Sequence, residues 1–428
     1  MVRKLKHTDI GDIPVDWELQ TFDETFRVLS NNTLSRENLN NRGGAVRNIH
    51  YGDILTKFPE VLNCKEEIPY VNELSLLSSS TQLLQDGDIV IADTAEDETV
   101  GKVTEVQNLG DSKLVAGLHT IPCRVKKGDF APGWLGYYMN SNLFHNQILP
   151  YITGIKVSSI SKGAISETLI LVPPFDEQEK IVQSLNEVQL LMTAETKVVN
   201  KMKFVKNGCL SKMFPQKDAT VPEMRLPGFT EAWEQRKVTD LGEIYIGLVT
   251  TMTEHYTDQG HLLIRNSDIK DGFFEFGENP IYLDEEFSEQ NKSRMHQLGD
   301  VITVHTGDIG TSAVIGDNEV NSIGFATIVT RPNQEVLDSD YFATYLNTDT
   351  HKQWAISMAT GDGRSNYNLK DYTKLVVPIP QIKEQKKIAA CIGNLNNLIT
   401  LHQCKCDKYS NIKKGMMSDL LTGKIRLV

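Results

Sequence analysis

An internal repeat constrains the fold of this chain more than any other feature of its sequence. The segment LILVPPFDEQEKI at 169–181 reappears as KLVVPIPQIKEQKKI at 374–388. Shorter matches in the same order accompany it, including a Trp-Glu pair that starts at Trp17 and again at Trp233. Over the later part of each copy the offset is about 207 residues, the size of a domain rather than of a solenoid unit. The sequence therefore predicts one module that occurs twice in tandem.

Within each copy, short β-rich runs come first and a long helix comes last. The runs are bounded by Gly, Asn and Asp, which is typical of strands separated by turns. They are GDIVIADT, HTIPCRV and TLILVPP in the first copy, and HLLIRN, GDVITVHT, ATIVTRP and KLVVPIP in the second. One helix is predicted after the third run, at about 131–148 and 338–357, with Asp338 or Ser339 as the cap of the second. The predicted fold class is α+β, a tandem duplication of a β-rich mixed α/β module followed each time by a long helix.

Both long helices, predicted at about 177–212 and 384–420, carry an apolar stripe in which steps of four and three residues alternate. The seam positions are Ile181, Leu185, Val188, Met192 and Glu195 in the first helix, and Ile388, Ile392, Leu395, Ile399 and His402 in the second. Each helix spans roughly 54 Å, and a helix of that length with one apolar stripe needs a partner. We predict that the two helices pair as an antiparallel coiled coil, with Glu195 and His402 within about one turn of each other.

The charge of the chain bears on what it can bind. The net charge is −12, which taken alone argues against a free-standing nucleic-acid-binding protein. The distribution is uneven, however, because six lysines and no acid lie between Lys197 and Lys217. That stretch is either a solvated helix face or a contact for a negatively charged partner. The sequence lacks a long apolar run and the apolar core of a signal peptide, so we expect a cytoplasmic protein.

Motifs that would indicate an enzyme are missing from the sequence. It contains no P-loop, no HExxH and no GxSxG, and the run from Gly361 departs from the dinucleotide fingerprint at Asn366. Val172-Pro-Pro-Phe resembles the Asp/Asn-Pro-Pro-aromatic motif of amino-methylating enzymes, but Val172 cannot accept the hydrogen bond that this motif requires. The run HQCKC at 402–406 fits none of the usual zinc spacings. We therefore predict no catalytic residue, no metal site and no cofactor.

Two modules, each closed by a proline-rich strand end, a Glu-Gln pair and a long helix, resemble the specificity subunit of type I restriction–modification enzymes. The resemblance rests on VPPFDEQEKI and VPIPQIKEQKKI at the helix starts, and on IGDIPVDWE and LPGFTEAWE at the module starts. It covers essentially the whole chain. It implies target recognition domain 1 at 1–175 (module one), a long helix at 176–214, a linker at 215–225, target recognition domain 2 at 226–381 (module two), and a long helix with its tail at 382–428.

The resemblance also implies a function. Each module would read one half of a split DNA target, and the coiled coil would set the distance between the modules. The implied partners are double-stranded DNA, two copies of a DNA adenine methyltransferase subunit and a translocase/endonuclease subunit, and the chain itself would have no catalytic site. Two other interpretations remain open. One is a coiled-coil scaffold or adaptor whose two modules bind protein or sugar, and the other is a fused methyltransferase, which would need a cofactor loop.

Side chains that suit base edges are densest in the loop before the last strand of each module. Arginine and lysine suit guanine, asparagine and glutamine suit adenine, and hydroxyls serve either. The predicted DNA contacts are Lys156, Ser158, Ser159 and Lys162 in the loop at 154–162, and Arg364, Asn366, Tyr367 and Asn368 in the loop at 361–370. Second choices at the ends of early strands are Arg47, Asn48, Arg265 and Asn266. The alternative for each residue is an ordinary surface position, because many protein–DNA contacts go to phosphates instead.

Overall fold

Two compact units make up the chain, and each combines one module with parts of both long helices. The computed structural model describes residues 4–154, 156–216, 219–359 and 366–427. Unit 1 consists of Met1–Glu195 and Lys405–Val428, and unit 2 consists of Thr196–Cys404. Unit 1 is therefore discontinuous in sequence, whereas unit 2 is a single stretch of chain.

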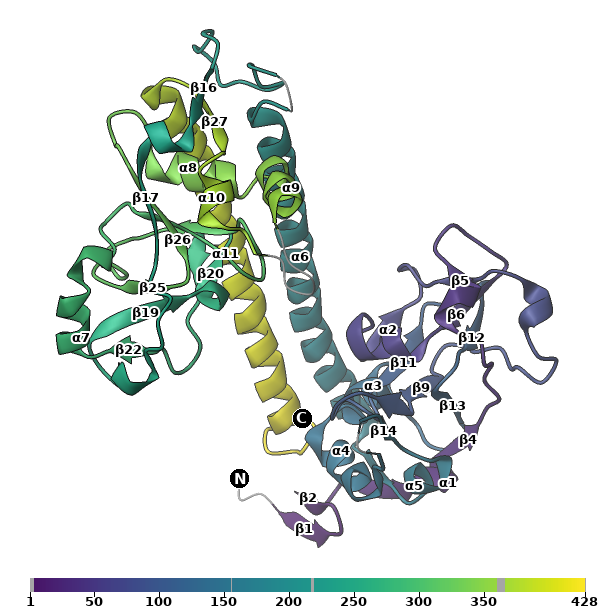
Figure 1. The fold of residues 1–428 in the computed structure, drawn as a ribbon. Helices are drawn as coiled ribbons and strands as arrows, with labels where there is room; N and C mark the ends of the chain where they lie inside the picture. Colours follow the sequence, from purple (N-terminus) through teal and green to yellow (C-terminus); the bar gives the residue numbers. More distant parts are fainter. Residues whose placement is uncertain (1–3, 155, 217–218, 360–365, 428) are drawn as a thin grey trace. The chain divides into compact units, whose positions relative to one another are not determined.

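The boundaries between the units fall inside the two long helices (Figure 1). Helix α6 runs from Phe175 to Met213 and helix α11 from Ile382 to Leu420, so both helices are confirmed close to their predicted bounds. Each unit contains the start of its own long helix and the end of the other one. The finer division of the chain into modules, helices and a linker stays a prediction.

A five-stranded sheet forms the centre of module one, in the order β4-β13-β9-β11-β7. Its strands are β4 (Phe26–Val28), β13 (Thr120–Val125), β9 (Ile89–Ala92), β11 (Val103–Gln107) and β7 (Val61–Asn63). A four-stranded sheet contains β12 (Lys113–Ala116), β6 (Val46–Ile49), β8 (Tyr70–Val71) and β5 (Leu39–Asn40). All four residues of β9 are buried, as expected of an apolar central strand covered on both faces.

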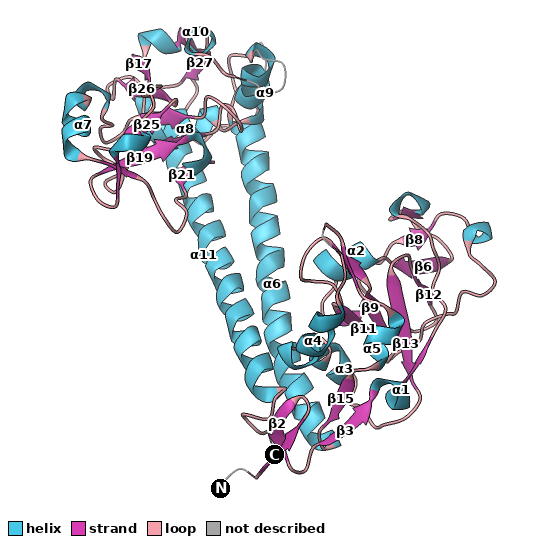
Figure 2. Ribbon diagram, turned by 60° about the horizontal axis from the view of Figure 1, so that its bottom comes forward, coloured by secondary structure: helices cyan, strands magenta, loops and turns pink. Residues whose placement is uncertain are grey.

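Module two repeats this plan with two four-stranded sheets. The first contains β17 (Gly242–Ile246), β26 (Ile328–Pro332), β23 (Val301–Thr303) and β24 (Ser312–Val314). The second contains β18 (Tyr256–Thr257), β22 (Tyr282–Leu283), β19 (His261–Arg265) and β25 (Ile323–Phe325). Figure 2 shows the same mixture of short strands and short helices in both modules. The predicted β-rich duplication is confirmed.

The last strand of each module pairs with a strand from the start of the same module. In module one β15 (Leu169–Val172) is antiparallel to β3 (Glu18–Thr21). In module two β27 (Val376–Ile379) is antiparallel to β16 (Glu234–Lys237). Each module is thus closed by its own ends just before its long helix begins.

The single helix predicted inside each module is in fact two helices. Module one contains α3 (Trp134–Tyr138) and α4 (Asn142–Ile148), and module two contains α8 (Ser339–Leu346) and α9 (Asp349–Met358). The prediction of one helix was wrong because a hydroxyl side chain caps the second helix in each case. Ser141 accepts a hydrogen bond at the start of α4, and Thr348 does so at the start of α9. Asp338 caps α8, as expected.

The Glu-Gln pair at the start of each long helix connects that helix to its own module. The amide group of Gln178 accepts a hydrogen bond from Ala131 N at 3.0 Å, and that of Gln385 accepts one from Asp338 N at 2.9 Å. Both side chains also donate at 2.8 Å to the carbonyl of the proline five residues earlier. Both glutamines are completely buried. Because each buried amide is satisfied as donor and acceptor, the angle at which the helix leaves the module is fixed.

The glutamate of each pair contacts an arginine that follows the other long helix. Glu177 accepts hydrogen bonds from Arg426 Nε at 2.6 Å and Nη2 at 2.7 Å, and from Trp17 Nε1 at 2.9 Å. Glu384 accepts from Arg225 Nε and Nη2, both at 2.8 Å. Both glutamates are buried. Since a buried carboxylate is costly without a partner, each unit is stable only when the other copy of the repeat supplies its arginine.

The helix segments pack antiparallel in each unit, as predicted. In unit 1 Lys413 Nζ donates to Gln189 Oε1 at 2.7 Å, so the end of α11 lies beside the start of α6. In unit 2 Met213 at the end of α6 shares a hydrophobic core with Ile388 near the start of α11. Residue numbers thus rise along one helix as they fall along the other.

All the predicted seam residues are buried or half-buried. The apolar ones nearest the modules, Ile181, Leu185, Ile388 and Ile392, belong to the module cores. The Oε1 atom of Glu195, a polar seam residue, lies 3.6 Å from Lys405 Nζ in unit 1. Because Glu195 and His402 belong to different units, their proximity stays a prediction.

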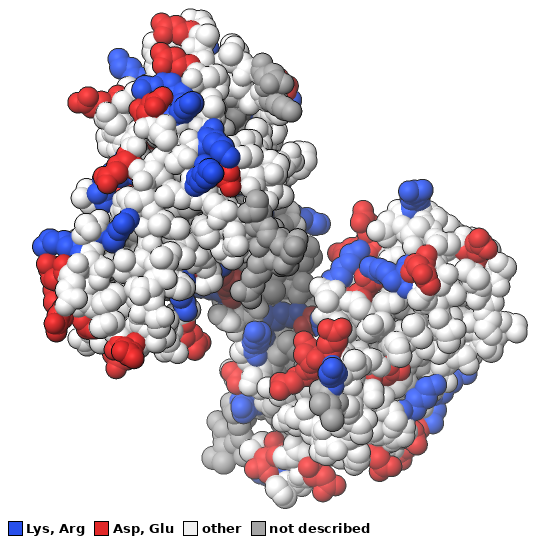
Figure 3. Space-filling model, viewed as in Figure 1, with Lys and Arg blue, Asp and Glu red and all other residues white. Residues whose placement is uncertain are grey.

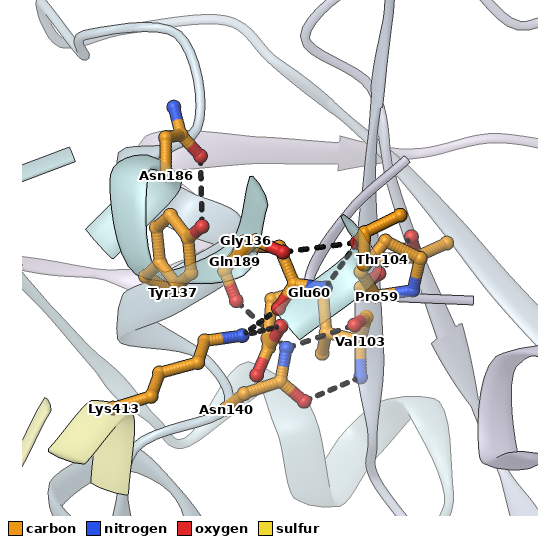
Figure 4. A network of polar contacts seen from close by, with 11 residues as sticks. Pro59, Glu60, Val103, Thr104, Gly136, Tyr137, Asn140, Asn186, Gln189 and Lys413 are labelled. Carbon is orange, nitrogen blue, oxygen red and sulfur yellow. Dashed lines mark hydrogen bonds and ion pairs between the residues drawn. The ribbon is translucent and has the colours of Figure 1, made fainter. Parts of the chain in front are cut away.

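One buried lysine in each unit connects the incoming helix to the module. Lys413 on α11 donates to Glu60 of module one and lies 5.3 Å from the centre of the Tyr137 ring (Figure 4). Lys206 on α6, its equivalent in the repeat, donates to Asp271 of module two at 2.9 Å. The lysine-rich stretch is therefore partly a structural contact, and Lys206 is not on a solvated helix face.

Replacing Lys413 with methionine should destabilise unit 1, because the mostly buried carboxylate of Glu60 loses its positive partner. We expect the free energy of unfolding to fall by about 2–3 kcal/mol, measured by urea denaturation. The neighbouring exposed Lys414 is the control, and Lys414→Met should change stability by less than about 0.5 kcal/mol. Adding Glu60→Leu to Lys413→Met should recover most of the loss. Equal losses in the two single lysine variants would contradict the role of this ion pair.

Candidate nucleic-acid interface

In module two, the end of strand β23 contacts the loop that precedes the last strand. Thr306 pairs with Asn366 as an isolated antiparallel bridge, and its hydroxyl donates to Asn366 Oδ1 at 2.9 Å. His305 Nδ1 lies 2.8 Å from the Thr306 hydroxyl. Asn266 accepts from His305 N at 2.7 Å and donates to the carbonyl of Ala326 at 3.2 Å. Two predicted contact residues, Asn266 and Asn366, are thereby brought to one place.

Module one has the same arrangement at the end of strand β9. Strand β10 (Thr94–Ala95) pairs antiparallel with β14 (Ser158–Ser159), and Thr94 is opposite Ser159. Thr94 Oγ1 donates to Asp93 Oδ1 at 2.8 Å and lies 3.2 Å from Nδ1 of His119. Predicted residues Ser158 and Ser159 are therefore on a short strand beside the end of the central sheet.

We call these matching positions the strand-end surface. It comprises Asp93, Thr94, His119 and Ser159 in module one, and His305, Thr306, Ala326 and Asn366 in module two. The match follows from the repeat, because GDIVIADT corresponds to GDVITVHT and HTIPCRV to ATIVTRP. All eight residues are at least partly exposed. The threonine is common to both modules, whereas the other three side chains differ.

Three of the predicted contact residues are part of the protein interior. Tyr367 is completely buried, and its hydroxyl lies 3.3 Å from His351 Nε2. Arg47 is buried and donates to the carbonyl of Cys64, and Asn48 is buried with its Oδ1 accepting from Asn32. In these positions the three side chains hold the fold together and do not present hydrogen-bonding groups to a DNA base.

The remaining predicted residues are at the surface or outside the described part of the chain. Lys156 and Lys162 are exposed, and Lys162 opens the short helix α5 (Lys162–Ser166). Arg265 is partly exposed, but its guanidinium makes two hydrogen bonds to Asp268, at 2.9 and 3.0 Å. Asn368 is half-buried at the start of α10 (Leu369–Tyr372). Arg364 lies outside the described residues.

Sequence reasoning missed the residues that line the loop contacts from the central sheet: Asp93, Thr94, His119, His305 and Thr306. The loops before the last strand attracted attention because of their composition, whereas four of these residues come just after apolar strands and His119 directly precedes one. The usable signal was the repeat itself. Aligning the two copies places Thr94 and Thr306 at the same position after a buried strand, and their neighbours at 93 and 305 differ in chemistry.

The charged side chains do not form a large basic patch on the visible face. Figure 3 shows lysines and arginines interspersed with acids over the described part of both units. Among the described residues, no cluster of three or more His, Cys, Asp or Glu has a geometry suited to a metal ion. No described helix is long and apolar enough to span a membrane.

Comparison with known families identifies similar proteins. Residues 230–408 match the family described as type I restriction modification DNA specificity domain. A relative from Methanocaldococcus jannaschii, named as a putative type I restriction enzyme MjaX specificity subunit, is 24% identical, with 99% of this chain and 96% of the relative aligned. The type I restriction enzyme EcoBI specificity subunit of Escherichia coli is 22% identical over 60% of this chain and 59% of its own length.

Solved structures share the fold. The crystal structure of the type I restriction–modification system S subunit from M. genitalium has a TM-score of 0.59 and 14% identity, covering 98% of this chain and 99% of that one. A chain from a study of complex assembly and conformational transition of the type I system has a TM-score of 0.56 and 15% identity, covering 96% and 99%. At these identities the likeness concerns the fold alone.

The histidine beneath the loop of module two should make stability depend on pH. Burial lowers the pKa of His351 from the ordinary 6.5 to about 4. Between pH 6.5 and 4 the unfolded chain therefore binds a proton that the folded chain does not, so stability falls as the pH falls through this range. His351 alone contributes a slope of about 1.4 kcal/mol per pH unit to this dependence. His351→Gln should reduce the slope in urea denaturation, whereas His7→Gln, on an exposed hairpin, should leave it unchanged. An unchanged slope in the His351 variant would contradict the assignment.

Proposed function

We propose that this chain is a specificity subunit of a type I restriction–modification enzyme and reads a bipartite DNA target through its two modules. Module one recognises one half of the target and module two the other half. The helix pair α6 and α11 keeps the two halves at a fixed spacing. Methyl transfer and cleavage are carried out by partner subunits, a DNA adenine methyltransferase present in two copies and a translocase/endonuclease.

The observation that carries this proposal is the strand-end surface, which occurs twice on the same backbone with different side chains. A threonine that follows a strand of the central sheet contacts the loop before the last strand in both modules. Around it, Asp93, His119 and Ser159 in module one correspond to His305, Ala326 and Asn366 in module two. Hydroxyl, amide, carboxylate and imidazole groups are those that discriminate base edges. The same scaffold with different polar groups accounts for two unlike half-sites.

Phosphate contacts supply the remaining affinity in this proposal. Lys156 and Lys162 of module one flank the loop that carries Ser158 and Ser159, and both are exposed. Lysines at such positions orient a protein on the duplex without reading its sequence. In module two Asn266, Asn368 and the loop residue Arg364 are assigned to the same interface. An acidic chain can still bind DNA when partner subunits share the phosphate contacts.

Single substitutions on the strand-end surface test the assignment of one module to one half-site. Asn366→Ala should relax the preference for one base pair in the half read by module two by about tenfold, and Ser159→Ala should do so only in the other half. The measurement is a genome-wide map of methylated adenines, by single-molecule sequencing, in cells that carry each variant. Ser184→Ala on helix α6 serves as the control and should leave both halves intact. A parent protein that directs methylation to no split motif would refute the proposed function and favour the adaptor alternative.

The helix pair offers a flank where the methyltransferase subunits would bind. With the seam at heptad positions a and d, Leu191, Val205, Leu398 and Ile412 all occupy position g. Position g normally carries charged residues in a two-stranded coiled coil. Here the four side chains are apolar and between 41% and 48% exposed. In an antiparallel pair the g positions of both helices lie on the same flank, so an apolar stripe faces outward.

We assign this stripe to an amphipathic helix of each methyltransferase subunit. The opposite flank, position e, is already occupied by the modules, since Val182 in unit 1 and Ala389 in unit 2 are buried in the module cores. Leu191 and Ile412 lie in unit 1, and the equivalent pair Leu398 and Val205 lies in unit 2. A pair that occurs once in each unit fits two copies of one partner.

Charged substitutions on the stripe should remove the methyltransferase subunits one at a time. The double variant Leu191→Lys, Ile412→Lys should retain one copy instead of two, because lysine cannot be buried against an apolar helix face without a partner. The stoichiometry is read by native mass spectrometry of the purified complex. Asn411→Lys, at the exposed position next to Ile412, is the matched control and should retain both copies. Two retained copies in the double variant would refute the docking site.

A further inference from the structure

The backbone at His119 has a conformation that L-residues seldom adopt. Its φ is 53°, and the equivalent Ala326 in module two has a φ of 50°. Every residue other than glycine has a conformational cost in this region, although asparagine, aspartate and histidine occupy it more often than the rest. The Ala326 backbone shows that the fold accepts a plain Cβ at this point. The imidazole of His119 is thus not required by the turn, and its presence calls for another explanation.

A short chain of hydrogen bonds orients the imidazole of His119. Thr94 Oγ1 lies 3.2 Å from His119 Nδ1 and 2.8 Å from Asp93 Oδ1, and Asp93 Oδ1 is also 3.4 Å from His119 Nδ1. An ionised carboxylate only accepts, so the threonine hydroxyl donates to Asp93. The hydroxyl oxygen then accepts from His119 Nδ1, which must carry the hydrogen. In the neutral ring this assignment leaves Nε2 as a hydrogen-bond acceptor.

The imidazole ring of His119 contacts protein groups on one side and is exposed to solvent on the other. Tyr51 contacts it edge to face, with ring centroids 5.3 Å apart and an interplanar angle of 77°. Its contacts to polar groups, among the described residues, all use Nδ1. The side chain is nevertheless 46% exposed. A fixed and half-exposed acceptor beside Thr94 has the properties expected of a group that contacts a ligand rather than a packing residue.

We propose that His119 is a specificity-determining residue of module one and accepts a hydrogen bond from an exocyclic amino group in the major groove. This inference rests on the proposed DNA-reading function. Adenine N6 and cytosine N4 are the amino groups presented there, whereas guanine and thymine present acceptors. Asp93 and Thr94 act through His119 as positioning residues. Ala326 offers no acceptor, so the matching position of module two makes no such contact, which contributes to the difference between the half-sites.

The test uses the complete complex of this chain with its modification subunits, and begins with the target of the parent protein. His119→Ala should relax one position of the half-site read by module one, lowering its discrimination about tenfold, and leave the other half unchanged. Ala326, in the same backbone conformation, indicates that this variant folds. His7→Ala removes a histidine that also contacts an aspartate, Asp12 at 2.8 Å, but from an exposed hairpin. The His7→Ala control should leave the base preference unchanged at every position of the target.

A second measurement removes single amino groups from the DNA, and its first arm uses the parent protein, whose result does not depend on the folding of a variant. Duplexes carry purine in place of one adenine, or pyrimidin-2-one in place of one cytosine, so that a single amino group is removed. One of these replacements should weaken binding by the parent complex about tenfold and have no further effect on His119→Ala. The replacement that weakens binding shows whether His119 contacts an adenine or a cytosine.

The outcomes separate this inference from the proposed function. If the parent protein selects a split motif and His119→Ala keeps every position of it, His119 does not read a base. Equal sensitivity of the parent and the variant to each missing amino group leads to the same conclusion. If the parent complex selects no split motif at all, the proposed function itself fails.

Discussion

The structure depends on two buried carboxylates, Glu177 and Glu384, that begin the long helices. A buried carboxylate is tolerated only with a well-placed positive partner, and here Arg426 and Arg225 each supply a paired set of hydrogen bonds. Each arginine follows the helix of the other repeat copy. The helices must therefore run antiparallel, since in no other arrangement would the end of one reach the start of the other.

The same exchange fixes the modules to the helices. Lys413 and Lys206 occupy equivalent repeat positions, and each enters the module of the other copy to meet an acid, Glu60 or Asp271. No such ion pair with a helix is seen on the side of each module where the central strands end, among the described residues of the strand-end surface. There a threonine common to both modules contacts a loop, and the side chains around it differ between the modules. The two copies thus share the contacts between helix and module but differ in the residues of the strand-end surface.

Much of the architecture could be predicted from the sequence because periodic signals are local. Apolar residues at alternating steps of four and three, together with the repeat offset, predict the ends of α6 and α11 to within a few residues. The partners of Glu177 and Glu384 could not be found in this way, since they are 249 and 159 residues distant. Glutamine in the Glu-Gln pair gave no hint that it would be buried.

The candidate interface was only partly predictable for a related reason. Residue type identifies chemistry but not direction, and Tyr367, Arg47 and Asn48 have suitable polar groups that the fold turns inward. Tyr367 is one residue from Asn366, yet the two side chains have opposite environments because the chain there alternates between the sheet edge and the core. Thr94 and His119 escaped notice because neither belongs to a polar cluster in the sequence. The pairing of β9 with β13 brings His119 to Asp93 and Thr94, and the pairing of β10 with β14 adds Ser159.

The discontinuity of unit 1 affects the order in which a newly made chain can fold. Unit 2 is one continuous stretch, 196–404, so all of its residues are synthesised before residues 405–428 of unit 1. Unit 1 needs residues 1–195 and 405–428, and these two segments are separated in sequence by the whole of unit 2. Until the second segment is made, Trp17 and the carboxylate of Glu177 lack the Arg426 side chain that packs against both. Module one is therefore synthesised before unit 2 but completed after it, and incompletely folded units of this kind expose apolar surface.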